Sequence, residues 1–522
     1  MDKLISEDFY NYNVAVKLVD ENVARGFGEK TAIYHLEQQI TYNQVQAEVN
    51  KLGNGLKSLG VAMEDRVLLL LLDCPEFIYS FFGTIKIGAV AIPTNTLLKP
   101  EDYLYLLNDC RAKVVIVSEE LAHLIEAIRS RTKYLLNVIV VGRDQSGQIA
   151  YSDLTAGQSE VLNAAETCKD DPALWLYSSG TTGFPKGAVH LHHDMIYAAD
   201  TYAKGILKLG PDDITYSVAR LFFSYGLGNA LYYPFRVGAA TVLSPQRPEP
   251  ELVLANVEKY KPTIFYSVPT SYRALLETAA SNNADFSSVR ICVSAGEALP
   301  ANIFHRWKDR FGLEIIDGLG CTEILNIFIS NRPGWAIPEC TGQVVPGYEV
   351  KIVDENGKDL PKGEVGTLYV KEDSIAAYYW NKHEKSKATF LGEWLNTGDR
   401  FYQDDSGYFW FVGREDDLLK VGGIWVSPLE VERTLLKHEA VSECAVIGKA
   451  DEDNLIKPKA FIVLKGQYDS NDELAHDLKQ FIKDQIAYYK YPRWIQFVSD
   501  LPKTATGKIQ RYKLRELEGG GL

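Results

Sequence analysis

The sequence predicts an α/β protein with a large N-terminal body of doubly wound sheets, a small β-rich subdomain and a small α+β domain at the C-terminus. Up to about residue 330, short apolar runs alternate with helical stretches, as in buried parallel strands joined by helices. From 347 to 411 the chain changes to short β runs separated by turn residues, which indicate hairpins. A charged segment ending in paired glycines then leads into a small α+β pattern.

The elements of the large body follow from two periodicities. One helical face is formed by four residues spaced 4, 3 and 4 apart, Val45, Val49, Leu52 and Leu56. Apolar runs predict strands at 66–72, 112–117, 136–141, 174–177, 263–267, 289–293 and 314–316.

In the remainder, hairpin strands are expected at 348–353 and 366–370. The last part predicts strands at 445–447 and 460–464 and a helix whose face is Leu474, Leu478, Phe481 and Ile482. We therefore expect two domains, 1–415 and 416–522, with the boundary near Asp416.

Composition excludes several classes of protein. The chain has 522 residues, of which 46% are hydrophobic and 24% charged, which is typical of a folded, core-forming protein. Its net charge of -14 disfavours nucleic acid and anionic membranes as partners. The most apolar region, 67–93, is interrupted by charged residues and proline, so no membrane span is expected. An acidic N-terminus and seven scattered cysteines favour a cytoplasmic protein with reduced thiols.

A glycine-rich segment from Tyr177 to Gly187 carries the strongest chemical signal. Glycines let backbone N–H groups converge on one point, and hydroxyls and a lysine add further donors, which together suit a polyphosphate. The segment is not a Walker P-loop, because Pro185 precedes the lysine and no Gly-Lys-Ser/Thr opens a helix. The predicted phosphate-binding residues are Ser178, Ser179, Gly180, Thr181, Thr182, Gly183 and Lys186.

With this segment, the chain resembles the adenylate-forming superfamily of acyl- and aryl-CoA ligases, peptide-synthetase adenylation domains and firefly-type luciferases. The resemblance spans nearly the whole chain. Within the superfamily, the chain most resembles benzoate-CoA and 4-hydroxybenzoate-CoA ligases. Its further motifs are Ala295-Gly-Glu-Ala-Leu-Pro300, Asp317-Gly-Leu-Gly-Cys-Thr-Glu323, Asn396-Thr-Gly-Asp399, Gly413-Arg414, Gly422-Gly423 and Pro502-Lys-Thr-Ala-Thr-Gly-Lys-Ile-Gln-Arg511.

The resemblance implies ATP, Mg²⁺ and CoA as cofactors and co-substrates. A carboxylate is a poor electrophile, so it first displaces pyrophosphate from ATP, and the protein stabilises charge at the α-phosphate. By resemblance, Thr322 contacts phosphate, Glu323 holds Mg²⁺, and Lys508 neutralises both the substrate carboxylate and the α-phosphate. The implied adenine-side residues are Ala295, Gly296, Glu297, Asp317 and Gly318, and the implied ribose ligands are Asp399 and Arg414.

The resemblance also implies a second step, in which the small C-terminal domain is mobile and rotates before a thiol attacks the acyl-adenylate. Asp416 matches the family's hinge position, where a junction between domains can absorb a large backbone change. Gly422 and Gly423 are expected to line the pantetheine tunnel. Tyr489, Lys490 and Arg493 are candidates for the nucleotide end of CoA.

Aromatic and small residues alternate between Leu221 and Asn229, a pattern that favours a flat apolar site for a planar ring. By resemblance to benzoate-CoA ligases, the ring site comprises Phe223, Ser224, Tyr225, Gly320, Asn326 and Ile327. The sequence departs from those ligases at Ser224, where they have alanine, and at Asn326, where they have histidine and halobenzoate ligases have asparagine. A buried amide and a buried hydroxyl require hydrogen-bond partners, and a ring hydroxyl could supply one. We therefore hypothesise benzoate and a hydroxybenzoate as substrates.

Other interpretations remain open. The chain could load a carrier protein, act as a luciferase-like oxygenase or regulate through nucleotide binding, and it could be a monomer or a homodimer. His190, His192 and His193 are expected to pack in a loop, since we see no carboxylate or cysteine at a metal-binding interval. Cys321 has no paired base and is expected to be a small packing residue.

Overall fold

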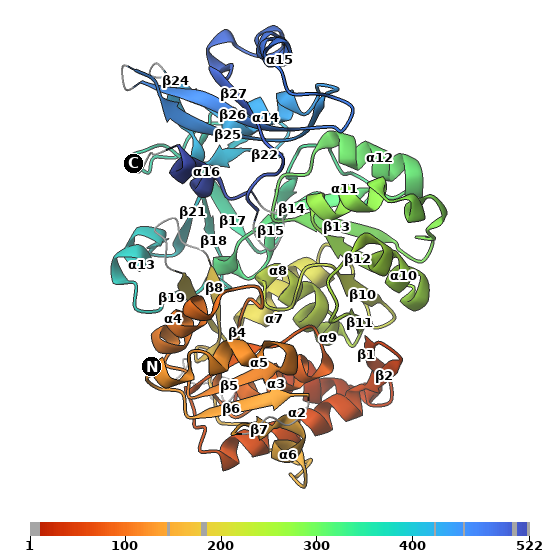
Figure 1. The fold of residues 1–522 in the computed structure, drawn as a ribbon. Helices are drawn as coiled ribbons and strands as arrows, with labels where there is room; N and C mark the ends of the chain where they lie inside the picture. The colour runs from red at the N-terminus through yellow and green to blue at the C-terminus, as the bar shows by residue number, and fades with distance from the viewer. Residues whose placement is uncertain are drawn as a thin grey trace. The chain divides into compact units, whose positions relative to one another are not determined.

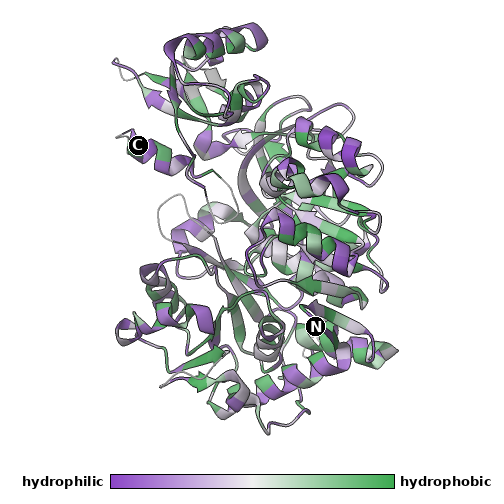
Figure 2. Ribbon diagram, turned by 45° about the vertical axis from the view of Figure 1, so that its right-hand side comes forward, coloured by the Kyte–Doolittle hydropathy of each residue, from purple (hydrophilic) through white to green (hydrophobic). Residues whose placement is uncertain are grey.

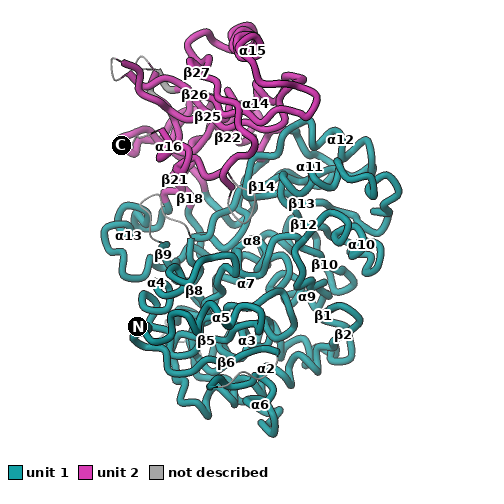
Figure 3. The backbone as a smooth tube through the Cα atoms, viewed as in Figure 1, with its two compact units in different colours: residues 1–338, 342–349, 371–395 teal, residues 339–341, 350–370, 396–522 magenta. Residues whose placement is uncertain are grey.

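The protein is described by a computed structural model over residues 11–142, 147–178, 185–421, 424–452, 455–503 and 509–518 (Figure 1). The fold is α/β throughout, as the sequence predicts. The chain divides into two compact units, each described by itself below. Unit 1 comprises residues 1–338, 342–349 and 371–395, and unit 2 comprises 339–341, 350–370 and 396–522 (Figure 3).

Unit 1 contains two large sheets. The eight-stranded sheet has the order β19 (Tyr378–Tyr379), β9 (Lys186–Leu191), β8 (Pro172–Ser178), β4 (Val90–Pro93), β3 (Arg66–Leu70), β5 (Val114–Ser118), β6 (Asn137–Val141) and β7 (Ile149–Ala150). The pairings from β8 to β7 are parallel, while β9 is antiparallel to both β8 and β19. A short segment far along the chain, β19, therefore completes the edge of a sheet that the first 191 residues build.

The nine-stranded sheet of unit 1 has the order β16 (Gln343–Val344), β15 (Ile327–Ser330), β14 (Ile315–Gly320), β13 (Ile291–Ala295), β12 (Ile264–Ser267), β10 (Ile214–Ser217), β11 (Ala240–Leu243), β1 (Thr31–His35) and β2 (Gln38–Thr41). From β14 to β1 the pairings are parallel. The carboxyl ends of β13 and β14 consequently lie next to each other, which matters for the nucleotide motifs below.

Helices cover these sheets because their apolar residues recur on one face. They are α2 (Tyr42–Ser58), α3 (Pro75–Lys86), α4 (Pro100–Cys110), α5 (Glu119–Glu126), α6 (Tyr151–Thr155), α7 (Asp194–Ala198), α8 (Ser224–Leu227), α9 (Tyr233–Val237), α10 (Pro250–Tyr260), α11 (Pro269–Glu277), α12 (Ala301–Phe311) and α13 (His383–Thr389). The predicted face of α2 is confirmed: Val45, Val49, Leu52 and Leu56 are fully buried. Figure 2 shows hydrophobic residues concentrated in the strands and hydrophilic ones on loops and helix surfaces.

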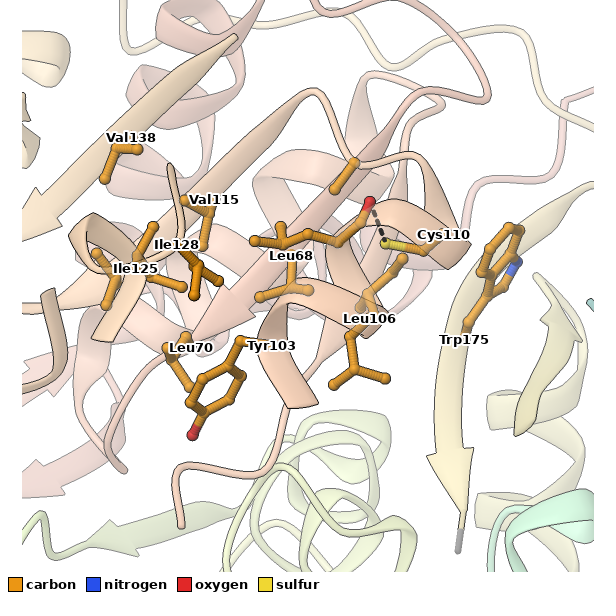
Figure 4. Packing of buried hydrophobic residues seen from close by; sticks show 14 of the residues in the cluster. Leu68, Leu70, Tyr103, Leu106, Cys110, Val115, Ile125, Ile128, Val138 and Trp175 are labelled. Carbon is orange, nitrogen blue, oxygen red and sulfur yellow. Dashed lines mark hydrogen bonds between the residues drawn. The ribbon is translucent and has the colours of Figure 1, made fainter. Parts of the chain in front are cut away.

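The predicted apolar strands form two separate cores. Strands β3 to β6 pack against α4 and α5 through Leu68, Val115, Leu106 and Ile125 (Figure 4). On the other sheet, Phe265 of β12 packs among aromatic residues of α11 and α12, with its ring 6.4 Å from that of Trp307. The strands predicted at 66–72, 112–117, 136–141, 174–177, 263–267, 289–293 and 314–316 are all confirmed, with boundaries shifted by a few residues.

Unit 2 holds most of a five-stranded sheet made of β17 (Glu349–Val353), β18 (Gly366–Lys371), β21 (Trp394–Gln403), β20 (Phe390–Leu391) and β22 (Phe409–Arg414). It continues into the hairpin β23 (Leu419–Val421) and β24 (Ile424–Val426) and the sheet β25 (Val441–Ala450), β26 (Ile456–Leu464) and β27 (Trp494–Phe497). Its helices are α14 (Pro428–Leu435), α15 (Asp472–Gln485) and α16 (Arg511–Leu517). The predicted hairpins and the α+β pattern are thus confirmed.

A partly buried acid, Glu372, lies just after β18 and belongs to unit 1. The Glu372 carboxyl accepts hydrogen bonds from the hydroxyl of Ser374, at 2.6 Å, and from its backbone N–H. Burial raises the pKa of Glu372 from 4.5 to about 8, the hydrogen bonds from Ser374 oppose the rise, and the negative charges of Asp194 and Asp373 add to it. The folded protein therefore keeps this proton at neutral pH.

Glu372→Gln should make stability less dependent on pH. Because the folded pKa lies above the unfolded value, the native protein holds the proton between pH 5 and 8 while the unfolded chain releases it, so stability falls as pH rises. Glutamine cannot ionise. Urea unfolding should show the variant gaining about 2–4 kcal/mol over wild type between pH 5 and pH 8. The exposed Glu364→Gln is the control, and an equal difference at both pH values for Glu372→Gln would contradict the assignment.

Candidate functional site

The glycine-rich segment is the loop of a β-hairpin. Strands β8 and β9 are antiparallel, and the last pair of their register is Ser178 with Lys186. The Ser178 hydroxyl is buried and finds no hydrogen-bond partner among the described residues. Five of the predicted phosphate-binding residues, Ser179, Gly180, Thr181, Thr182 and Gly183, lie outside the described residues. Of the predicted set, the structure therefore places Ser178 and Lys186, one at each end of the loop.

Lys186 opens β9 and reaches the carboxylate predicted to hold a metal ion. Its Nζ lies 3.0 Å from Oε1 of Glu323 and donates a hydrogen bond of 2.6 Å to the hydroxyl of Tyr379. That hydroxyl donates in turn to the same Oε1, also at 2.6 Å. The sequence motifs therefore predicted two of the three members of this group and missed the third.

The charge of Glu323 is set by these contacts. Burial alone would raise the pKa of this carboxyl, but the Lys186 ammonium and the hydrogen bonds from Tyr379 and Lys186 outweigh it and lower the pKa to about 2. Burial, with the adjacent carboxylate, raises the pKa of Tyr379, which keeps its proton. The group at neutral pH is therefore an ammonium, a neutral phenol and an ionised carboxylate.

Three consecutive backbone carbonyls around Glu323 are each held by a different donor. Nε2 of His190 lies 2.8 Å from the oxygen of Thr322, the N–H of Ala376 donates to the oxygen of Glu323 at 2.8 Å, and the Ser374 hydroxyl donates to the oxygen of Ile324 at 3.3 Å. The short helix η7, Thr322–Ile324, is thereby fixed on both sides.

The histidine cluster has hydrogen-bond partners, and one of our expectations about it is wrong. Asp194, four residues after His190, is a carboxylate at a close interval, which the sequence interpretation overlooked. It lies 2.8 Å from Nδ1 of His190 and 2.8 Å from Nδ1 of His193. His192 accepts a hydrogen bond from the N–H of Val14, and burial lowers its pKa to about 4. Within the described ranges, no group of three or more His, Cys, Asp or Glu side chains is arranged to hold a metal ion.

A strained residue redirects the chain after η7. Leu325 has φ of 69°, a conformation that costs a bulky residue on the order of 1–3 kcal/mol. Asn326 comes next, immediately before β15; it is 3% exposed and accepts a hydrogen bond of 2.9 Å from the N–H of Ile327 through Oδ1. The side chain therefore presents Nδ2, a donor, on its remaining polar side.

The predicted ring-site residues fall into two groups on neighbouring elements. Gly320 pairs with Ile327 across β14 and β15, and a Cβ on Gly320 would lie 2.3 Å from the carbonyl oxygen of Asn326. A Cβ on Gly228 would lie 2.1 Å from Nδ2 of Asn326 and 2.8 Å from the hydroxyl of Tyr232. Both glycines are thus required by the close approach of Asn326.

The second group lies around the start of α8. Phe223 packs on Phe222 with ring centres 4.4 Å apart, and the Tyr225 hydroxyl donates to the carbonyls of Ser267 and Val293 at 3.3 and 3.2 Å. Ser224, at the first position of α8, shares no hydrogen bond with Asn326 in the described part of the chain. The sequence missed Gly228 and Tyr232, although Gly228 falls within the predicted aromatic segment.

The adenine-side motifs meet at the carboxyl ends of two parallel strands. The register pairs Ser294 with Asp317 and Ala295 with Gly318, so the two motifs lie side by side. Gly296 follows with φ of 91°, where a Cβ would meet no atom within 4 Å. Glu297 continues the same turn, on the side of β13 at which nucleotide-binding α/β sheets hold their ligands.

The remaining described motifs belong to unit 2. Asp399 and Arg414 are a register pair on β21 and β22, and Nη1 of Arg414 lies 2.8 Å from Oδ1 of Asp399. Asp416 lies in the short helix η8, Glu415–Asp417. Lys490 contacts both carboxylate oxygens of Glu430 at 2.6 Å.

Tyr489 lies in the short helix η9 (Tyr488–Lys490) of unit 2, and Arg493 follows this helix. The guanidinium of Arg493 lies 3.8 Å from the ring centre of Tyr491, and Tyr489 packs at the edge of the local core. Gly422, Gly423 and Lys508 are outside the described residues.

All seven cysteines lie among the described residues as reduced thiols, and Cys321 is partly exposed beside Thr322. No helix in the described ranges combines the length and apolarity needed to cross a membrane.

Comparisons with known proteins agree along the whole chain. The family model for AMP-binding enzymes matches residues 20–380, and that for the AMP-binding enzyme C-terminal domain matches 430–508. A benzoate-CoA ligase of Thauera aromatica is 47% identical over 97% of this chain and 96% of its own length. A 4-hydroxybenzoate-CoA/benzoate-CoA ligase of Rhodopseudomonas palustris is 42% identical over 98% of this chain and 95% of its length.

Among solved structures, the anthranilate CoA ligase AuaEII in complex with anthranoyl-AMP has a TM-score of 0.93 and 47% identity, covering 98% of both chains. The likeness extends through both units. The chain belongs to the AMP-binding enzyme family, the adenylate-forming superfamily whose motifs its sequence carries.

Proposed function

We propose that this chain is an ATP-dependent aryl-CoA ligase that activates benzoate or a substituted benzoate and transfers the acyl group to CoA. The observation that carries the proposal is the buried Glu323 carboxylate, whose Oε1 lies 3.0 Å from Nζ of Lys186 at the end of the glycine-rich hairpin loop. The aryl substrate is supported by the ligases to which the chain is similar over its whole length.

The residues around Glu323 suit a magnesium ion bound together with phosphates. Mg²⁺ prefers oxygen ligands, of which proteins supply one or two carboxylates while nucleotide phosphates supply others. Glu323 is ionised because of its contacts, and the adjacent Thr322 carries a hydroxyl. When bound, the ion would offset the negative charge of the triphosphate. In this proposal Glu323 would hold the ion, while Lys186, Ser178 and the loop residues between them would contact the phosphates.

The first step forms one bond and breaks one. A carboxylate oxygen of the substrate attacks the α-phosphorus of ATP, and the bond to the β-phosphate breaks, releasing pyrophosphate and leaving the aryl-adenylate. Lys508 is proposed to neutralise the two anions that approach each other. Gly296, Glu297 and Asp317 would flank adenine, and Asp399, oriented by Arg414, would accept hydrogen bonds from the ribose hydroxyls.

In the second step the CoA thiolate attacks the acyl carbon and AMP leaves. We propose that residues 1–415 act as the body and 416–522 as the mobile domain, with Asp416 as the hinge and Gly422 and Gly423 along the pantetheine path. We propose that Lys490 and Arg493 contact the nucleotide end of CoA. In the structure, Lys490 forms an ion pair with Glu430, and the guanidinium of Arg493 packs on the ring of Tyr491. A CoA phosphate would compete with Glu430 for the same ammonium.

The aryl acid accepted by the enzyme is the first test. Wild-type enzyme with ATP and Mg²⁺ should release pyrophosphate with benzoate or a ring-substituted benzoate and, when CoA is added, form the thioester and AMP. The panel includes hydroxybenzoates, halobenzoates, 2-aminobenzoate, cyclohexane carboxylate and fatty acids. A strong preference for medium-chain fatty acids over every aryl acid would contradict the proposal of an aryl substrate. Acyl transfer only to a carrier protein would support a carrier-loading enzyme, and oxygen uptake with light emission would support a luciferase-like oxygenase. Absence of turnover would support a nucleotide-binding regulator.

Lys508→Ala should separate the two half-reactions. Removing the cation that faces both anions should lower aryl-adenylate formation on the order of 10²–10³-fold. Thioester formation from preformed benzoyl-adenylate and CoA should stay within a few-fold of wild type, because the lysine is not needed there. Lys513→Ala, in α16, is the matched lysine control. Equal losses in both half-reactions would contradict the role given to Lys508.

Asn326 should set the preference among ring substituents. Oδ1 is occupied by the N–H of Ile327, so Nδ2 is left to donate to an acceptor on the ring, such as a hydroxyl oxygen. Asn326→Ala should lower kcat/KM for the preferred hydroxybenzoate relative to benzoate by about tenfold or more. Ser224→Ala, measured in parallel, shows whether the hydroxyl contributes. A ratio unchanged in Asn326→Ala would exclude Asn326 from substituent recognition.

A further inference from the structure

The hydroxyl of Tyr379 bridges the two charged groups proposed to bind ATP and its metal ion. It lies 2.6 Å from Nζ of Lys186 and 2.6 Å from Oε1 of Glu323. An ammonium only donates and an ionised carboxylate only accepts, so the phenol must accept from Lys186 and donate to Glu323. The direction of this hydrogen bond is therefore determined by the chemistry of its partners.

The position of the hydroxyl is fixed by the backbone and ring that carry it. Tyr379 pairs with Ala188 across β19 and β9, and its N–H donates to the Ser386 hydroxyl at 3.0 Å. The ring is 2% exposed and packs on Phe390 with ring centres 5.0 Å apart. A donor held at backbone and ring cannot follow the carboxylate if the carboxylate moves, so it selects one orientation.

The same segment also holds the backbone of Glu323. Ala376 donates to the carbonyl of Glu323 and Ser374 to that of Ile324, and Trp380 donates to Gly187 of β9. Residues 374–380 thus fasten η7 to β9 through the main chain, and Tyr379 adds the one contact from this segment to the carboxylate itself. This last contact is a side-chain feature that a single oxygen deletion removes.

We infer that Tyr379 is a positioning residue for ATP activation, whose hydroxyl keeps the Glu323 carboxylate oriented when Lys186 turns to the phosphates. The inference rests on the proposed function, in which Glu323 binds the metal ion and Lys186 the nucleotide. Lys186 and Tyr379 both contact Oε1, so departure of the ammonium leaves the phenol as a neutral side-chain donor on that oxygen. A neutral donor orients the carboxylate without cancelling the charge that attracts the cation.

Tyr379→Phe and Tyr378→Phe form a matched pair for the test. Successive strand residues point to opposite faces, and Tyr378 is 39% exposed, so the control loses a hydroxyl outside the group. Calorimetry measures ATP binding to each protein with Mg²⁺ and with EDTA. Tyr379→Phe should weaken Mg²⁺-dependent ATP binding about 10- to 100-fold, the range for a hydrogen bond to a charged group, while binding in EDTA stays within about twofold.

A second pair of measurements separates positioning from general damage. If the hydroxyl acts through Glu323, the effect of Tyr379→Phe on Mg²⁺-dependent binding should disappear in a Glu323→Gln background. Thioester formation from preformed benzoyl-adenylate should be unchanged in Tyr379→Phe, since that step no longer involves the triphosphate. Retained ATP binding in EDTA shows that the variant is folded.

Two results would overturn the inference: Mg²⁺-dependent ATP binding by Tyr379→Phe equal to that of Tyr378→Phe, or a loss that persists fully in the Glu323→Gln background. Failure of the proposed function looks different. In that case the wild-type protein would activate no aryl acid at all, whatever the two tyrosine variants bind.

Discussion

The arrangement of the site depends on keeping one carboxylate ionised in a buried position. Burial opposes the charge of Glu323, and removing an uncompensated carboxylate from water costs several kcal/mol. Lys186 supplies the compensating charge and Tyr379 a hydrogen bond, and together they bring the pKa to about 2. These three side chains come from three segments that are far apart in the sequence, β9, η7 and β19, so the sheet edge must form before the site exists.

Hydrogen bonds also fix the backbone of the loop that carries Glu323. Three successive carbonyls have separate donors, and the chain then passes through Leu325 at a strained positive φ before Asn326 turns inward. Such strain persists only where the surroundings determine the conformation, and it commonly marks functional sites. Here it joins the carboxylate proposed for metal binding to the amide proposed to face the aryl ring, with only two residues between them.

Much of this could be predicted from sequence because the signals are local. Apolar runs gave the strands, a 3.6-residue period gave the buried face of α2, and glycines with hydroxyls marked the hairpin loop ended by Lys186. Tyr379 could not be found in this way, since it reaches Lys186 across 193 positions and lies in no glycine-rich or charged motif. Asp194 could have been found, because a carboxylate four residues after His190 is visible in the sequence.

The basic residues near the C-terminus show where a local sequence signal is misleading. From 485 to 515 the sequence has seven basic residues and one acidic residue, which suggests an exposed patch for anions. The structure instead pairs Lys490 with Glu430, Lys503 with Glu443, and Arg511 with Glu432. A local charge count misses carboxylates that arrive from earlier segments, so under the proposed function CoA would have to compete with Glu430 for Lys490.

The central claim is that the Glu323 carboxylate is the metal-binding group of an aryl-activating enzyme. The most direct measurement is benzoate-dependent exchange of pyrophosphate into ATP by wild type and Glu323→Gln over a range of Mg²⁺ concentrations. The account predicts that the variant loses on the order of 10²-fold or more of this exchange while thioester formation from preformed benzoyl-adenylate stays within about threefold. Exchange by Glu323→Gln within a few-fold of wild type at every Mg²⁺ concentration would contradict it.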